Sequence, residues 1–179
     1  KNARMMDQVF QIEKTGKREK GEIQHLHEYI HYLTGEIHKA IITVSKMDLS
    51  QDDAGKIAVL IRISDLSHQL ADQIWYLCEK IHKSRENPDV ISEEFVESFT
   101  TITAPVLENL TMLSESFPSL SQATDDTMRA NDSLLRDRVN QHYGMHIRKM
   151  ADSDDESGTV MYGILSAIEQ ISVTIREIR

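Results

Sequence analysis

One helical pattern occurs twice in this chain, at residues 61–74 and again at residues 165–178. A shift of 104 positions aligns the two segments and places Asp65 over Glu169, with apolar residues matched on both sides of each acid. A repeat of this spacing is too long for a short solenoid unit and is typical of a duplicated module. The sequence therefore predicts a fold assembled from two copies of one unit.

The repeat includes the helices that precede these segments. A shift of 109 positions aligns Gly35 with Gly144 and the apolar residues around them. Each copy of the later helix also follows a capping box, in which an acid comes three residues after a serine at the helix start: Ser50 with Asp53, and Ser153 with Glu156. We predict a single domain over residues 1–179, with the first repeat at about 1–87 and the second at about 88–179.

Hydrophobic periodicity predicts that this domain is all-α, a six-helix bundle built from two three-helix repeats. The chain has only 7 glycines and 3 prolines, and its apolar residues recur with the period of an amphipathic helix. The expected helices lie at about residues 2–14, 20–46, 51–83, 92–116, 120–150 and 154–179. Pro105 falls inside the fourth, yet one apolar stripe continues across it, so we predict one kinked helix there.

The second and third helices carry apolar residues in alternating steps of three and four, the spacing of a bundle seam. Its residues are Ile23, Leu26, Ile30, Leu33, Ile37, Ala40 and Val44 in the second helix, and Leu60, Ile63, Leu66, Leu70, Ile74, Leu77 and Ile81 in the third.

Charge and cysteine content exclude several classes of protein. The net charge of -9 disfavours binding to DNA or RNA, because such binding relies on clustered Lys and Arg that displace counterions. No apolar run approaches the roughly 18 residues of a transmembrane helix. The single cysteine, Cys78, has no possible intrachain partner, which favours a reducing compartment.

Three Glu-x-x-His pairs occur in the second and third helices: Glu22 with His25, Glu28 with His31, and Glu79 with His82. In ferritin-like bundles such pairs bind two metal ions in the core. The seam places the latter two pairs on the side away from the apolar stripe, so we expect them to be solvated surface residues. A ferritin-like metal-binding bundle is the alternative, and it requires these side chains to face one another inside the bundle.

Other reactive groups give weaker signals. His142 and His146 lie four residues apart and could share a zinc ion or a buried polar contact, but the sequence shows no further ligand. Cys78 is expected to be inert on a packed helix. Four histidines are spread around the second helix and indicate no site: His25, His27, His31 and His38. With no phosphate loop and no nucleophile elbow, the chain is not expected to be an enzyme.

The duplicated three-helix module resembles the PhoU family, in which the last helix of each module carries a Glu-Arg-Ile-x-Asp-His-like segment. The best match lies at residues 157–172, where Tyr162 precedes the segment Ala-Ile-Glu-Gln-Ile-Ser that contains Glu169. This stretch is similar to part of the PhoU-like domain at the C-terminal end of bacterial sodium/phosphate cotransporters. The resemblance in architecture spans the chain, and the resemblance in motif is confined to the third and sixth helices.

This resemblance implies a metal site. The family's Glu/Asp-x-x-x-Asp motif places two carboxylates one turn apart on an outward helix face, where they bind multinuclear metal clusters. Here Gln69 replaces the second acid after Asp65, although Asp72 adds a carboxylate on the same face, and an apolar residue replaces the second acid after Glu169. We expect that a divalent metal ion, if one binds, binds weakly at Asp65, Asp72 and Glu169.

The resemblance also implies a function. It predicts a regulatory, non-catalytic domain of a sodium-dependent phosphate transporter that acts through protein–protein contacts. The expected partners are the membrane transporter domain of the same chain, another copy of the domain, or a signalling protein. Mainly from this resemblance, and in keeping with a sequence that starts at Lys1 and not at Met, we expect a cytoplasmic domain tethered to the inner membrane by an upstream transmembrane region. The alternative is a free-standing PhoU-type phosphate-signalling regulator.

Overall fold

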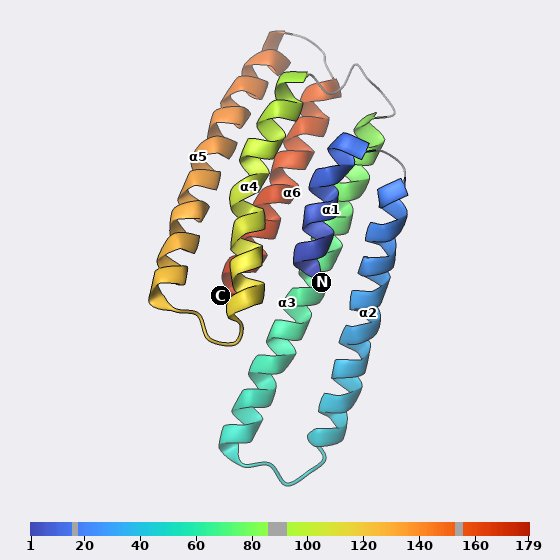
Figure 1. Cartoon of the computed structure of the whole chain (residues 1–179), viewed down its shortest axis with the longest axis vertical. Coiled ribbons are helices and arrows are strands. Elements are labelled where there is room, and N and C mark those ends of the chain that lie inside the picture. The colour runs from blue at the N-terminus through green and yellow to red at the C-terminus, as the bar shows by residue number, and fades with distance from the viewer. Residues whose placement is uncertain (16–17, 86–92, 153–155) are drawn as a thin grey trace.

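The structure is a computed structural model that describes residues 1–15, 18–85, 93–152 and 156–179. Over these residues it contains six helices and no strand: α1 (Asn2–Thr15), α2 (Arg18–Val44), α3 (Gln51–Arg85), α4 (Glu93–Ser116), α5 (Gln122–Asp152) and α6 (Glu156–Ile178). They pack as a bundle (Figure 1). The predicted all-α fold with six helices is therefore confirmed, and each helix lies within a few residues of its predicted place.

The start of α3 shows how local sequence sets a helix end. The Ser50 Oγ accepts a hydrogen bond from the Asp53 backbone N–H at 3.1 Å, which satisfies one of the free donors of the first turn. The same hydroxyl donates to the Asp53 carboxylate at 2.6 Å. Ser50 is thus the N-cap that the sequence predicts. The second box begins at Ser153, which lies outside the described residues.

Pro105 lies inside α4, which continues through it as one helix, in agreement with the prediction of an undivided helix. Proline has no N–H, so the Thr101 carbonyl four residues earlier loses its usual helical partner. The Arg138 guanidinium, from α5, donates a hydrogen bond to that carbonyl. A side chain from the neighbouring helix thus replaces the missing backbone donor.

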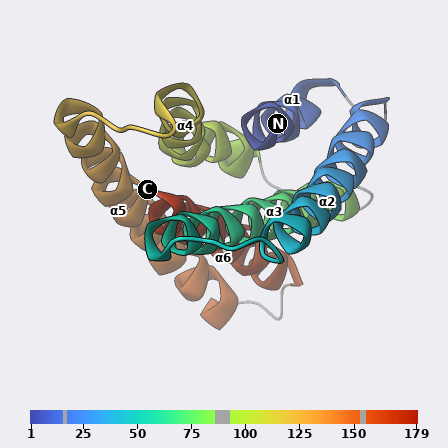
Figure 2. The same ribbon diagram turned by 90° about the horizontal axis from the view of Figure 1, so that it is seen from below.

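Each half of the chain forms a unit of three mutually contacting helices, α1 to α3 and α4 to α6. The halves meet through α3 against α6, the most extensive helix pair, and through α1 against α4. Both pairs join helices at the same place in the two predicted repeats. The helices α2 and α5 stand at opposite edges of the bundle in both views (Figures 1 and 2). Superposition of the halves themselves stays a prediction.

The core runs without a break through both units. Leu70 and Ile74 of α3 and Ile168 and Ile171 of α6 are all buried in one cluster that also includes residues of the other four helices. A hydrogen bond crosses the same interface, from the Thr174 hydroxyl to the Gln73 side-chain oxygen at 2.9 Å. The two units therefore share a core.

The distal halves of α2 and α3 extend beyond the other helices (Figure 1). There the predicted seam is not buried: Ile37, Val44 and Leu60 are exposed, whereas Ile23, Ile30 and Leu70 nearer the other helices are buried. The predicted seam is therefore buried only where it lies near the other helices, because none of the other described helices packs on the distal part. No described helix is long and apolar enough to span a membrane.

Candidate functional site

An open apolar groove runs between the distal halves of α2 and α3. It has a volume of about 570 Å³ and is lined by apolar side chains of both helices, including Leu33 and Ile37 from α2 and Leu60 and Ile63 from α3. The first residues of α1, Lys1 and Asn2, lie at one end of the groove. The helix α1 therefore fills the space between α2 and α3 only as far as its own first residues.

The beginning of α1 is attached to the wall of this groove. The Asn2 side-chain amide donates a hydrogen bond to the backbone oxygen of Ser67 on α3 at 3.0 Å. Met5, Met6 and Val9 of α1 are fully buried in the core beyond it. The helix α1 thus shows how a helix occupies the position between α2 and α3, and the groove is the part of that position that remains open.

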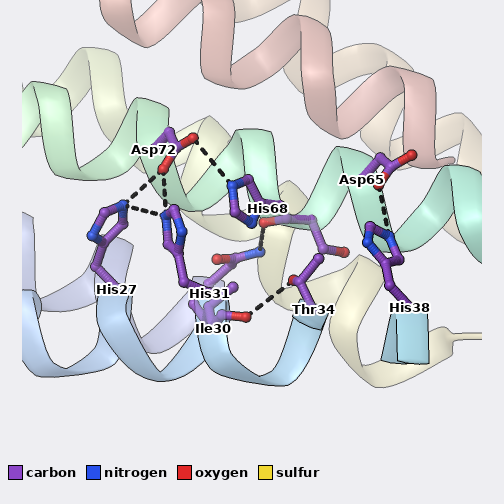
Figure 3. A network of polar contacts seen from close by, with 10 residues as sticks. His27, Ile30, His31, Thr34, His38, Asp65, His68 and Asp72 are labelled. Atoms are coloured by element: carbon purple, nitrogen blue, oxygen red, sulfur yellow. Dashed lines mark hydrogen bonds and ion pairs between the residues drawn. The ribbon is translucent and has the colours of Figure 1, made fainter. Parts of the chain in front are cut away.

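The predicted metal residues fall into three separate settings. Asp72, on α3, lies 2.8 Å from the Nε2 atoms of both His27 and His31. Asp65, also on α3, lies 3.0 Å from the Nε2 of His38. Both acids face α2 (Figure 3). Glu169, on α6, instead accepts a hydrogen bond from the Tyr143 hydroxyl at 2.9 Å, and it belongs to neither histidine contact.

Imidazole side chains from both α2 and α3 gather around Asp72, which contacts three histidines. The Nε2 atoms of His27 and His31 are 3.0 Å apart, and the Nε2 of His68 lies 3.6 Å from the other Asp72 oxygen. Burial alone raises the pKa of the Asp72 carboxyl, but hydrogen bonds from His27 and His31 and the charge of His68 outweigh it and lower that pKa. Asp72 is thus held ionised among imidazoles.

Among the described residues, the group of three potential metal ligands that converge closely is His27, His31 and Asp72. Asp72 is the member that the sequence analysis identified. His68 was missed, and His27 was named only in a histidine tract that indicated no site. His31, expected to be a solvated surface residue, is partly exposed and contacts Asp72 of α3. The sequence did contain a signal for this group. His27 and His31 are four residues apart, as are His68 and Asp72, and the two helices that carry these pairs were predicted to be neighbours.

The ferritin-like alternative is not supported by the described side chains. Glu28 and Glu79 are exposed to solvent, as expected, and do not converge with His31 and His82 inside the bundle. The other zinc candidate, His142 with His146, is not tested, because the side chain of His146 lies outside the described ones.

Burial raises the pKa values of two potential nucleophiles, Cys78 and Tyr143. Cys78 is fully buried, and burial raises the pKa of its thiol to about 11. The pKa of the Tyr143 hydroxyl is raised by burial and by its hydrogen bond to Glu169. A buried neutral thiol is a poor nucleophile. The expectation that Cys78 is inert agrees with this environment.

Comparison of the chain with protein-family models, characterised proteins and solved structures finds no match.

Proposed function

We propose that this chain is a regulatory, non-catalytic domain that acts by binding a helix of a partner protein in the groove between α2 and α3. One observation supports this: a helix packs between α2 and α3 along only part of their length. The helix α1 occupies one part, and the same two helices continue beyond it with an exposed apolar lining.

The apolar lining of the groove indicates what kind of segment would bind there. Ile37, Leu60 and Ile63 are apolar, and the ordinary way to cover such a surface is a third amphipathic helix, as α1 does in the adjoining section. Exposed apolar residues scattered singly need no explanation, but a row along two neighbouring helices is typical of an interaction surface. The occupant is therefore an amphipathic helix that continues the path of α1.

The resemblance to PhoU-like domains of sodium/phosphate cotransporters supplies the identity of the partner. On that basis, the occupant belongs to the membrane transporter, and the domain works at the cytoplasmic face of the inner membrane. Deletion of the domain is then expected to alter the regulation of phosphate transport and leave transport itself intact.

A binding experiment tests this proposal. The purified chain is titrated onto the detergent-solubilised transmembrane part of the sodium/phosphate cotransporter from its own organism. Leu60→Glu places a charge in the apolar groove and is expected to weaken binding by at least about tenfold, because the charge must be desolvated when the helix docks.

The matched control is Val59→Glu. Val59 directly precedes Leu60 on α3 and is similarly exposed, at 57% against 52%, but it does not line the groove. Val59→Glu is expected to bind as the unmodified chain does. Equal weakening by both variants, or no binding by the unmodified chain, would reject the groove as the docking site for the transporter.

A further inference from the structure

We propose that His27, His31 and Asp72 form a binding site for one divalent first-row transition-metal ion of the zinc, cobalt or nickel class. This site is independent of the groove and of the partner helix. It differs from the expected carboxylate site at Asp65, Asp72 and Glu169, because two of its three ligands are imidazoles from α2.

The two helices place these ligands by simple spacing. His27 and His31 are four residues apart on α2, so their side chains lie one turn apart on the same face. Asp72 projects from α3 between them, and its Oδ1 is 2.8 Å from each Nε2 (Figure 3). The two Nε2 atoms are 3.0 Å from each other. Three ligand atoms thus form a nearly equilateral triangle.

Without a metal ion, no placement of hydrogens on the two Nε2 atoms makes all three contacts of this triangle favourable. A carboxylate oxygen only accepts hydrogen bonds, so a favourable contact between Asp72 and either imidazole requires a hydrogen on that Nε2. If both Nε2 atoms carry one, their 3.0 Å contact brings two donors together. If one lacks it, a nitrogen lone pair faces the carboxylate at 2.8 Å. A cation is attracted by all three atoms.

The dimensions of the triangle fit coordination to one ion. Three ligands on one face of an octahedron, with metal–ligand bonds of about 2.1 Å, are separated by about 3.0 Å. The observed separations are 2.8, 2.8 and 3.0 Å. Two imidazoles with one carboxylate favour zinc, cobalt or nickel over magnesium and calcium, which prefer oxygen ligands.

The surroundings suit a bound ion. His68, four residues before Asp72 on α3, has its Nε2 3.6 Å from the Asp72 oxygen that the triangle does not use, and can position the carboxylate. Asp72 is half-exposed and His31 is partly exposed, so water can complete the coordination. Because the ligands come from two helices, the ion links α2 to α3.

The chain contains its own reporter for this site. Trp75 is the single tryptophan, and its ring stacks on the ring of His27 with centroids 5.6 Å apart. Nickel and cobalt ions quench nearby indole fluorescence, so binding at His27 is expected to reduce the emission of Trp75. Zinc, which does not quench, is followed by calorimetry.

The experiment uses the chain freed of any polyhistidine tag. We expect one zinc ion per chain by calorimetry, and saturable quenching of Trp75 by nickel with the same stoichiometry. His31→Ala and Asp72→Ala are each expected to weaken zinc binding at least about 100-fold by loss of a ligand, and His68→Ala about 10-fold by loss of an outer partner. Circular dichroism verifies that each variant keeps its helices.

The matched control is His38→Ala, which removes another histidine of α2 that contacts an acid of α3 but lies outside the triangle. It is expected to bind zinc as the unmodified chain does. The groove variant Leu60→Glu is also expected to keep zinc binding, which separates this test from that of the proposed function. Absence of one-to-one binding in the unmodified chain, or equal losses in His38→Ala and His31→Ala, would overturn the site.

Discussion

At the scale of single residues, each acid on α3 that faces α2 meets imidazole. Asp65 contacts His38, and Asp72 contacts His27 and His31. The two sites differ in ligand number: Asp65 pairs with one ring, whereas Asp72 lies among three. A single exposed pair contributes little to stability, but convergent ligands can bind an ion. The difference makes Asp72 the residue of interest.

Cys78 provides a residue-scale prediction. At pH 8 a thiol with a pKa of about 11 is ionised in roughly one molecule in a thousand, whereas an ordinary thiol is ionised to roughly a quarter. Iodoacetamide is therefore expected to label Cys78 at pH 8 more than about 100-fold more slowly in the native chain than in urea. The comparison is made by mass spectrometry over time. Similar rates in the two states would show that the thiol is accessible.

The sequence allowed part of this residue-scale account to be predicted. The acids Asp65 and Asp72 could be identified because they fall on one face of one helix. Their histidine partners could not be identified. A contact such as that between His31 and Asp72 depends on how α2 is aligned along α3, which the connecting loop and the packing of the two helices both determine. Glu169 was grouped with the two acids by the repeat, but α6 places it against Tyr143.

At the scale of helices, α4 depends on its neighbour. Pro105 leaves the Thr101 carbonyl without its helical donor, and Arg138 of α5 takes its place. This contact explains how a proline is tolerated in the middle of an undivided helix. It also couples α4 to α5 in a way that the apolar pattern alone does not reveal.

A double-mutant cycle tests this coupling. Arg138→Ala is expected to destabilise the chain by about 1 kcal/mol, because a carbonyl loses a charged donor. In the Pro105→Ala background the backbone N–H of residue 105 is restored, so the same substitution is expected to cost clearly less. Denaturant unfolding gives the four free energies. If Arg138→Ala lowers the free energy of unfolding equally in both backgrounds, Arg138 does not replace the missing backbone donor.

The two ends of α3 are expected to respond differently to truncation. Leu70 is 1% exposed in the shared core, so Leu70→Ala is expected to destabilise the chain by about 2–5 kcal/mol. Leu60 lies in the open groove, and Leu60→Ala is expected to cost less than about 1 kcal/mol. Both are leucine-to-alanine changes in one helix, so intrinsic helix propensity affects them equally. Chemical denaturation measures both, and the reverse order would contradict the observed burial.

At the scale of the whole molecule, two three-helix units share one core through α3 with α6 and α1 with α4. The periodicity and the two repeat shifts were sufficient to predict six helices and their grouping, because both features are local or self-similar. The predicted ranges, 2–14 against 20–46 and 51–83, also imply that the first helix is too short to cover the other two, but they do not show where along α2 and α3 it packs. Figure 1 shows that α1 lies beside only part of α2 and α3, and the groove lies between these two longer helices beyond α1.

Site-specific photocrosslinking tests the central claim, that this groove receives a helix of the transporter. A photoreactive phenylalanine analogue is placed at Leu60 inside the groove, or at Tyr76, an exposed position on α3 outside it. The chain is then irradiated in membranes that contain the sodium/phosphate cotransporter of its own organism. Crosslinks from position 60, mapped by mass spectrometry to one amphipathic helix of the transporter and absent from position 76, are predicted. Equal crosslinking from both positions, or none from position 60, would contradict the account.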